Sequence, residues 1–390
     1  MKILFYDDVA VYGGHEVMFL GSLNSLLRTQ SLEIGVVFSQ QNERLKTELE
    51  QLRMKYPSLA LNSSDYTSGR FQFLRTAWAY LARRRLGTFF RGQAPDCVVV
   101  VQGEISLSSV GVIAARNAGC YTVSYLPLAH TRKQRGERVA WLKDKILRKY
   151  YQLPNHFITI GNSVQAMIRR QGAKQPIDIV ENGINLDSLN VFDKEEAREK
   201  LGIPQAEYIA ALVGRIEFRQ KGHDILLKAL ASRSSDFDGW KILIIGSGPD
   251  QLRLEAMITE LKLADKVILL PWQANLSEVY SAIDMVLMPS WFEGVPVVML
   301  EALYYGLPVV GTNIDAMKEL LPAENLFPVG DFDTLSERML HVRSQFSDLQ
   351  RQKDRQLIIN RFTKSRQEQE FKQVLLRCAH LGRDEKHKNV

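Results

Sequence analysis

Short apolar runs rich in β-branched residues recur along the chain, and segments with helical periodicity separate them. Val98–Val101 and Ile242–Ile245 are apolar at every position, so both faces of these strands must be buried. Central strands of parallel sheets have this property because helices cover both faces of such a sheet. The alternation of strand and helix therefore predicts doubly wound α/β sheets. The expected strands are Lys2–Tyr6, Glu33–Phe38, Cys97–Val101, Tyr121–Leu126, Phe157–Ile160, Asp178–Val180, Tyr208–Val213, Trp240–Ile245, Lys266–Leu270, Met285–Met288 and Pro308–Val310.

The predicted strands form two series that divide near residue 181. Glu181–Asn185 are turn residues that end the first series, whereas Phe192–Glu196 open a helix with acidic residues in its first turn. A chain of 390 residues is also long for a single core. We therefore expect two Rossmann-like domains, residues 1–180 and 181–365. Ligands bind at the carboxyl ends of parallel strands, so functional residues should follow the strands.

Composition limits the class of protein further. Three cysteines are too few and too scattered for a disulfide framework or a zinc knuckle. No apolar run reaches the ~18 residues that span a bilayer. The first strand ends at Asp7 and Asp8, which suits a strand boundary and not a signal peptide. We therefore expect a cytosolic protein, with peripheral contact to the inner face of the cell membrane as a further possibility.

Positive charge is concentrated in the first half of the chain. Residues 1–180 have 24 Lys and Arg against 13 Asp and Glu, and residues 181–390 have 26 against 31. The asymmetry suggests an anionic partner, although solvated surface charge also explains it. Residues 70–91 interleave arginines with apolar residues, which suits either an anionic membrane or a core helix with a basic outer face. The residues assigned to membrane or acceptor contact are Arg83, Arg84, Arg85, Arg132 and Lys133.

Two features of the first half point to a ligand. Gly13-Gly14 precedes an amphipathic helix, and paired glycines let backbone N–H groups approach a phosphate at a helix N-terminus. An ordinary tight turn is the structural alternative. His130 follows a predicted strand on a loop that should reach the ligand, although a lone histidine is often structural. Three other histidines compete for the same role, namely His15, His156 and His223.

Two loops of the second half also follow predicted strands. Gly214-Arg215, with Lys221 six residues later, places two cations where a diphosphate would bind. A solvated loop in which Glu217 pairs with Arg215 is the alternative. Gly246-Ser247-Gly248 also allows the backbone to approach a ligand, or it is simply a turn.

A pair of carboxylates follows the predicted strand Met285–Met288. Glu293 lies in a loop, Pro296 suits the start of a helix, and Glu301 lies on that helix. Eight residues separate the two acids, slightly more than two helical turns, so both can line one edge of the helix. Carboxylates accept hydrogen bonds from vicinal hydroxyls, which suits sugars. The helix dipole alone explains Glu293 but not Glu301.

Together these features resemble the retaining glycosyltransferases of family 4. The resemblance rests on Gly13-Gly14, His130, Asn182–Asn185, the loop from Gly214 to Lys221 and, above all, the Glu-x7-Glu pair of Glu293 and Glu301. It implies the α/β GT-B architecture, with two facing Rossmann-like domains, parallel sheets and an interdomain cleft. Residues 1–180 would form the acceptor-side domain, and residues 181–365 would bind the nucleotide-sugar donor. A C-terminal helix, about 366–390, would cross back onto the first domain.

The resemblance also implies roles for individual residues. Glu293 would hold hydroxyls of the donor sugar, and Glu301 would hold those of the ribose. Arg215 and Lys221 would neutralise the diphosphate, so neither a metal nor another cofactor is expected. His130 would contact the sugar near the reacting carbon. The remaining donor-binding positions are Gly13, Gly14, Asn182, Gly214, Gly246, Gly248, Gly294, Val295 and Pro296.

One position departs from the pattern of the family. Family members often have Phe-Gly where this chain has Val295-Pro296, and the proline removes a backbone N–H that would bond the donor.

The function expected on this basis is retaining transfer of a hexose. The donor would be a nucleotide-diphosphate sugar, with UDP favoured, and the acceptor a hydroxyl of a glycan, a glycolipid or a small molecule in cell-surface polysaccharide, lipopolysaccharide or glycolipid synthesis. Replacement of Arg215 or Lys221 by Ala should abolish activity while the fold survives. The alternatives are a nucleotide-sugar 2-epimerase of the same fold and a catalytically silent partner subunit. No recognition helix or stacking platform supports nucleic-acid binding.

Overall fold

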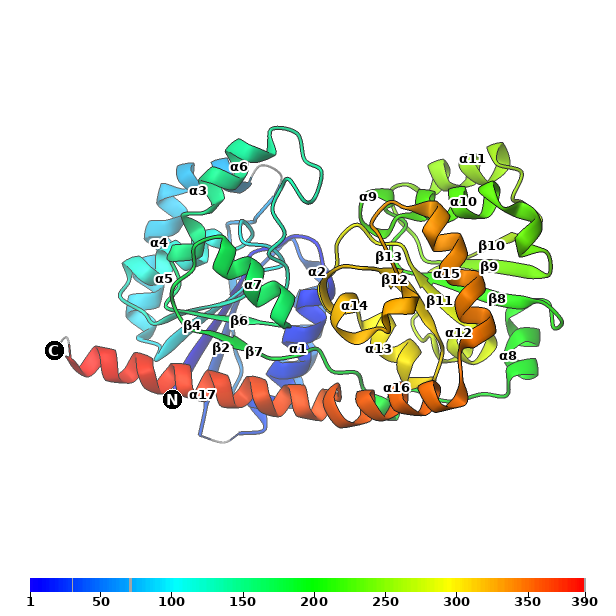
Figure 1. The fold of residues 1–390 in the computed structure, drawn as a ribbon. Coiled ribbons are helices and arrows are strands. Elements are labelled where there is room, and N and C mark those ends of the chain that lie inside the picture. Colours follow the sequence, from blue (N-terminus) through cyan, green and yellow to red (C-terminus); the bar gives the residue numbers. More distant parts are fainter. Residues whose placement is uncertain (30, 70–71, 389–390) are drawn as a thin grey trace. The chain divides into compact units, whose positions relative to one another are not determined.

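The computed structural model describes residues 1–29, 31–69 and 72–388 (Figure 1). The chain divides into two compact units, Met1–Asn182 with Ser365–Val390 and Gly183–Lys364. The first division falls two residues after the expected boundary at 180. Each unit is a parallel sheet with helices on both faces, so the predicted α/β class with two Rossmann-like domains is confirmed.

Unit 1 contains a seven-stranded parallel sheet in the order β3-β2-β1-β4-β5-β6-β7. Six of these strands lie within one residue of their predicted ends, and β3 was not predicted. The central strand β4 is fully buried, as its run of four valines requires. The strands are β1 (Lys2–Asp7), β2 (Glu33–Ser39), β3 (Ala60–Ser64), β4 (Cys97–Val101), β5 (Thr122–Tyr125), β6 (His156–Thr159) and β7 (Ile177–Ile179).

Helices cover both faces of this sheet. α4 and α5 pack on one face, where Leu86 and Phe90 of α4 join Leu4, Tyr6 and Val98 in a buried core. The helices are α1 (Gly14–Leu27), α2 (Glu43–Lys55), α3 (Gln72–Trp78), α4 (Tyr80–Gln93), α5 (Ser109–Asn117), α6 (Ala140–Leu147), α7 (Asn162–Arg170) and the 3-10 turn η1 (Tyr150–Gln152).

Unit 2 contains a six-stranded parallel sheet in the order β10-β9-β8-β11-β12-β13. Strand order reverses between β8 and β11, as in a Rossmann fold. The strands are β8 (Tyr208–Val213), β9 (Trp240–Ile245), β10 (Val267–Leu270), β11 (Met285–Met288), β12 (Val309–Thr312) and β13 (Leu326–Phe327). The helices are α8 (Lys194–Leu201), α9 (Phe218–Lys221), α10 (His223–Ser232), α11 (Gln251–Glu260), α12 (Ser277–Ala282), α13 (Val297–Tyr304), α14 (Asp315–Leu320), α15 (Phe332–Gln345) and α16 (Asp348–Arg361), with 3-10 turns η2 (Leu186–Ser188), η3 (Ser234–Phe237) and η4 (Ala323–Asn325).

The C-terminal helix α17 (Lys364–Lys388) packs against unit 1 (Figure 1). The Phe371 ring meets the Tyr125 ring edge-on, with the centroids 5.6 Å apart. Arg383 Nη2 lies 3.2 Å from Asp96 Oδ2. Gly382 is buried so closely against the Asp96 carbonyl that a Cβ at position 382 would overlap it. The tail therefore returns to the first unit through both apolar and charged contacts. In the described part of the chain, no helix has both the length and the apolar character needed to cross a bilayer.

Candidate functional site

The predicted donor residues of unit 2 gather where its strand order reverses. Gly214 and Arg215 directly follow β8, and Ser290 and Glu293 follow the neighbouring strand β11. The carboxyl ends of two such strands form the usual ligand crevice of an open α/β sheet. The sheet order therefore brings together two loops that are more than seventy residues apart in sequence.

Lys221 and Glu293 form an ion pair between these two loops. Lys221 Nζ lies 2.7 Å from Glu293 Oε1. The Lys221 stem passes so close to Gly214 that a Cβ at position 214 would lie 3.1 Å from Lys221 Cε. Gly214 also has a φ of +147°, which disfavours any other residue. The glycine at this position thus gives Lys221 its path to Glu293.

Glu293 is held by two further contacts. Ser290 Oγ donates to Glu293 Oε1 at 2.8 Å, and the Glu293 backbone N–H donates to Asp315 Oδ2 at 2.9 Å. Both the carboxylate and its backbone are fixed, so Glu293 is preorganised to accept hydrogen bonds from a ligand.

Glu301, the second acid of the predicted pair, lies on α13. Tyr280 of α12 donates its hydroxyl to Glu301 Oε2 at 2.8 Å. Burial raises the pKa of Glu301, while the hydrogen bond from Tyr280 lowers it in part. Gly294, Val295 and Pro296 connect the two acids, and Pro296 immediately precedes α13. Sequence analysis did not identify Tyr280 as a site residue, because a tyrosine at this position could equally be part of the apolar core.

Arg215, Gly246 and Gly248 are the remaining predicted donor residues of unit 2. Arg215 is largely exposed, and its Nε lies 3.6 Å from Glu217 Oε2. Gly246 and Gly248 pack against the carbonyl groups of Gly214 and Ile216, where a Cβ would overlap the oxygen. These two glycines let the loop after β9 lie against the loop after β8.

Gly13 and Gly14 lie in unit 1 where α1 begins. The Gly13 backbone N–H donates to Glu16 Oε2 at 2.7 Å, and the same oxygen lies 3.1 Å from His15 Nδ1. Asp7, at the end of β1, joins this group. One carboxylate oxygen of Asp7, one of Glu16 and one ring nitrogen of His15, each a possible metal ligand, all lie within 4.8 Å of one another. Burial raises the pKa of Asp7 to about 7, although the charge of His15 opposes the shift. The spacing of Glu16 three residues after the helix cap was the available signal for this cluster.

His130 also lies in unit 1, on the loop after β5. It lines a small cavity together with Leu128, Arg132, Asp144 and Tyr151. Asn182, at the end of unit 1, is buried. The residues predicted to bind the donor thus belong to both units. Unit 1 contains Gly13, Gly14, His130 and Asn182, and unit 2 contains Arg215, Lys221, Glu293 and Glu301.

The predicted membrane or acceptor residues have different surroundings. Arg84, Arg85 and Lys133 are exposed, whereas Arg83 is partly buried and donates to the Ala77 carbonyl at 3.1 Å. Arg132 is not a free surface cation. Its guanidinium pairs with Glu104 and, at 2.9 Å, with Glu137. These carboxylates are close because the loop after β4 lies beside the loop after β5.

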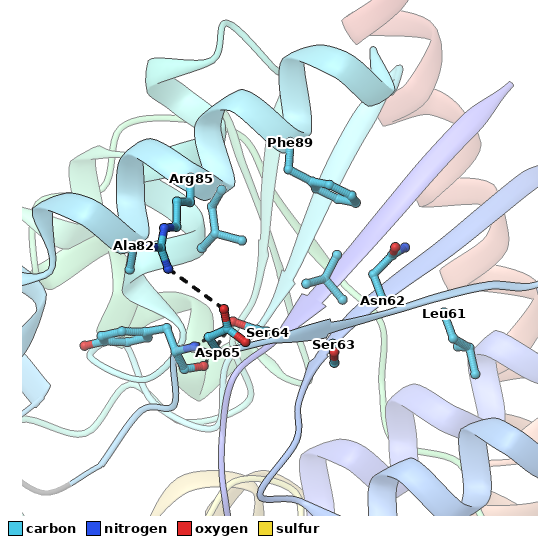
Figure 2. Close-up of a pocket in the computed structure, with 11 residues that line it drawn as sticks. Leu61, Asn62, Ser63, Ser64, Asp65, Ala82, Arg85 and Phe89 are labelled. Carbon is cyan, nitrogen blue, oxygen red and sulfur yellow. Dashed lines mark hydrogen bonds and ion pairs between the residues drawn. The ribbon is translucent and has the colours of Figure 1, made fainter.

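A cavity of about 580 Å³ lies between β3 and α4 of unit 1 (Figure 2). Leu61, Ala82 and Phe89 contribute apolar surface, and Asn62 and Ser63 contribute polar surface. Arg85 and Asp65 lie at one side, with Arg85 Nη1 4.0 Å from Asp65 Oδ2. All of the lining residues belong to unit 1, so the ion pair of Lys221 and Glu293 contributes nothing to this cavity.

Comparison with known proteins agrees with this arrangement. Residues 193–359, which lie in unit 2 and include Arg215, Lys221, Glu293 and Glu301, match the family described as glycosyl transferases group 1. A D-inositol 3-phosphate glycosyltransferase of Segniliparus rotundus is 37% identical over 149 residues, which are 37% of this chain and 33% of the relative. The match thus spans about one third of the length of that relative.

Solved structures resemble the chain over almost its whole length. Anabaena Alr3699/HepE in complex with UDP aligns with a TM-score of 0.78 at 18% identity, covering 96% of this chain and 99% of that protein. It has also been solved in complex with UDP-glucose. The lipopolysaccharide outer core galactosyltransferase WaaB, in its apo form, aligns with a TM-score of 0.69 at 20% identity, covering 96% and 99%.

The two parallel sheets and these likenesses define a protein of the GT-B class. Within that fold, the family match to the glycosyl transferases group 1 covers residues 193–359 of the second unit.

Proposed function

We propose that this chain is a retaining hexosyltransferase that uses a nucleotide-diphosphate sugar, with a UDP-sugar as the favoured donor. The main support for this proposal is the ion pair of Lys221 and Glu293, which lies at the point where strand order reverses in unit 2. This pair lies within the segment that matches the glycosyl transferases group 1. The complexes of Alr3699/HepE with UDP and UDP-glucose support UDP as the nucleotide to test first.

In the proposed reaction, the bond between the anomeric carbon and the diphosphate oxygen breaks. A new bond forms to an acceptor hydroxyl on the same face of the sugar, and the hydroxyl proton passes to the departing phosphate. Arg215 and Lys221 stabilise the negative charge on the leaving group, an effect worth about 3–4 kcal/mol for one well-placed donor. Glu293 holds sugar hydroxyls, and Glu301 holds ribose hydroxyls. His130 contacts the sugar near the reacting carbon, and the backbone from Gly294 to Pro296 contacts sugar or phosphate.

The two cations take the role of a divalent metal in this proposal, so transfer should proceed without one. The acceptor is a hydroxyl of a glycan or glycolipid in cell-surface polysaccharide, lipopolysaccharide or glycolipid synthesis. The likeness to the galactosyltransferase WaaB supports this class of acceptor. The cytosolic location expected from the sequence is part of the same proposal.

A thermal-shift panel with UDP, GDP, ADP and CMP, in EDTA, tests donor binding first. A ligand at about 100 times its dissociation constant adds about 2.7 kcal/mol of stability, which gives a measurable shift. We expect UDP to raise the melting temperature and a UDP-sugar to raise it further. If no nucleotide shifts the melting temperature, the transferase proposal loses its support, and the silent partner becomes the better interpretation.

Arg215→Ala is the variant that separates binding from folding. Arg215 is 63% exposed and its pairing with Glu217 at 3.6 Å contributes little to stability. Lys228→Ala is a matched control, because Lys228 is similarly exposed and lies 3.7 Å from Asp224 on α10. We expect Arg215→Ala to lose the UDP shift and Lys228→Ala to keep it. Equal shifts in both variants contradict the role of Arg215.

Lys221→Ala does not offer the same separation. We expected the fold to survive this substitution, but Lys221 is the ion-pair partner of the nearly buried Glu293. Removal of Lys221 leaves that carboxylate unpaired, which costs stability as well as binding.

Product stereochemistry tests the remaining part of the proposal. Proton NMR of the product formed from a UDP-α-sugar should show the α configuration if transfer retains configuration. A β product contradicts retention. Formation of a C2 epimer without any acceptor supports the epimerase instead.

A further inference from the structure

Large apolar side chains gather on the outer surface of α3, α4 and α6 in unit 1. Seven of the nineteen large apolar residues that are exposed in the described part of the chain fall within residues 74–81 and 139–142. Trp78 is 88% exposed and Trp141 is 70% exposed. We call these seven residues the apolar face: Leu74, Trp78, Tyr80, Leu81, Val139, Trp141 and Leu142. Isolated apolar residues on a surface are ordinary, but a cluster of this size marks an interaction site.

The three helices of the apolar face are neighbours in space. α3 and α6 contact each other, and only Ala79 separates α3 from α4 (Figure 1). Two segments more than sixty residues apart in sequence therefore lie on neighbouring helices, and each carries exposed apolar side chains.

The core of unit 1 does not use this face. α4 packs inward through Leu86, Gly87 and Phe90. Tyr80 and Leu81 at its start remain outside. Apolar side chains of this size gain free energy when a partner removes them from water, so an exposed cluster of them favours binding.

Positive charge surrounds the apolar face. The described residues between Asp65 and Asp96 include no acidic residue and five arginines: Arg75, Arg83, Arg84, Arg85 and Arg91. α6 adds Lys145 and also Lys143, whose ammonium lies 2.9 Å from Glu137 Oε2. The one acid of α6, Asp144, accepts the backbone N–H of Arg132 at 2.7 Å. At the edge of the face, Asp65 lies 4.0 Å from Arg85. The charge facing a partner is therefore predominantly positive.

We propose that the apolar face docks unit 1 onto an anionic lipid bilayer. Tryptophan and leucine would enter the interfacial region, and the arginines would contact anionic headgroups, which is how basic amphipathic helices bind membranes. A bilayer fits better than an acidic protein. The arginines flank the apolar residues along the helices, which suits an interface where lipid headgroups lie beside an apolar layer. The proposal does not depend on the transfer reaction, since vesicle binding is measured without a nucleotide.

Co-sedimentation with vesicles tests the proposal on the full chain. The vesicles contain phosphatidylcholine alone or with 30% phosphatidylglycerol, at low and at high salt. We expect binding to the anionic vesicles that weakens as salt rises, and much weaker binding to phosphatidylcholine. Failure of the unmodified chain to bind anionic vesicles overturns the proposal, whatever the outcome of the UDP panel.

Matched variants separate the apolar and the electrostatic contributions. Trp78→Ser with Trp141→Ser should weaken binding at least tenfold. The control is Trp272→Ser, which removes a tryptophan of unit 2 that is 61% exposed, and it should bind as the unmodified chain does. Arg84→Gln with Arg85→Gln should weaken binding on the order of twentyfold and reduce its salt dependence. Circular dichroism and the UDP shift confirm that each variant is folded.

Two outcomes contradict the choice of a bilayer. The first is vesicle binding that is unchanged in the double tryptophan variant. The second is a dimer, detected by sedimentation velocity, that the same variant abolishes, because the face would then bind a second copy of the chain.

Discussion

The side-chain ammonium of Lys221 lies 2.7 Å from Glu293 Oε1, although 72 residues separate the two in sequence. Lys221 is 16% exposed and Glu293 is 7% exposed, so the pair is largely removed from water. Glu293 also accepts from Ser290, and its backbone donates to Asp315. The pair joins the loops after β8 and β11, and it therefore contributes both to the stability of unit 2 and to the preorganisation of the proposed donor site.

A double-mutant cycle should reveal this coupling. We expect Lys221→Met to lower the free energy of unfolding by about 3 kcal/mol, because it leaves a nearly buried carboxylate unpaired. Glu293→Gln should also destabilise, and the double variant should lose less than the sum of the two, with a coupling of about 1–3 kcal/mol. Urea unfolding measures all three. Simple additivity contradicts the coupling.

Tyr280 should act as a positioning residue for Glu301. Tyr280→Phe removes the 2.8 Å hydrogen bond to Glu301 Oε2 and leaves the ring in place. If Glu301 holds the ribose, the dissociation constant for UDP should rise about tenfold while that for pyrophosphate stays unchanged. Isothermal titration with both ligands measures the difference.

Tyr305→Phe is the control for that prediction. The Tyr305 ring lies 5.2 Å from the Tyr280 ring, but its hydroxyl donates to the Asn190 carbonyl. It should leave the affinity for UDP within about twofold of the original. An equal loss in both variants assigns the effect to packing of the rings.

The docking of α17 on unit 1 depends on Gly382. A Cβ at this position overlaps the Asp96 carbonyl oxygen, so Gly382→Ala should destabilise unit 1 by about 1–3 kcal/mol. Gly92→Ala is the matched control, since Gly92 is also helical and has open space around its Cβ position. It should instead stabilise by about 0.5–1 kcal/mol through better helix propensity. Chemical denaturation of both variants measures the contrast, and a neutral Gly382→Ala contradicts close docking.

His223 should make unit 2 less stable in acid. Its ring is buried against Phe218, and burial lowers the pKa of His223 to about 4, with the charge of Lys221 adding to the shift. Between about pH 6.5 and pH 4 the unfolded chain binds a proton that the folded chain does not, so stability falls as pH falls, by about 3 kcal/mol at most. His223→Phe should remove this loss. Its stability relative to the original chain should be greater at pH 5 than at pH 8, as thermal unfolding will show. A difference that is the same at both pH values contradicts the assignment.

Most strands were predictable because their local pattern leaves little choice. Val98–Val101 and Ile242–Ile245 are apolar at every position, and they lie in β4 and β9, which both have a neighbouring strand on each side. β3 was missed because Ala60–Ser64 is a polar edge strand that pairs only with β2. β13 was missed because Leu326–Phe327 is only two residues long. A strand at the edge of a sheet is specified by its neighbour more than by its own pattern.

For the candidate site, the positions of the residues along the chain were predictable, but their contacts were not. The positions of Gly214, Arg215, Glu293 and Glu301 after strands follow from the sequence, because chain order and strand ends are local properties. The partner of each side chain does not follow. The ion pair of Lys221 with Glu293 was not predicted, and neither was the pairing of Arg132 with Glu104.

The sequence by itself determined the two series of strands, the spacing of the acidic pair and the basic, acid-free segment before β4, since each depends on residues close together along the chain. Tertiary structure decided which strands are neighbours. By placing β8 beside β11 it joined Lys221 to Glu293, and by packing α3 on α6 it brought two apolar segments onto neighbouring helices. Contacts of this kind depend on the order of strands in the sheet and on the packing of helices over it, which local pattern does not encode.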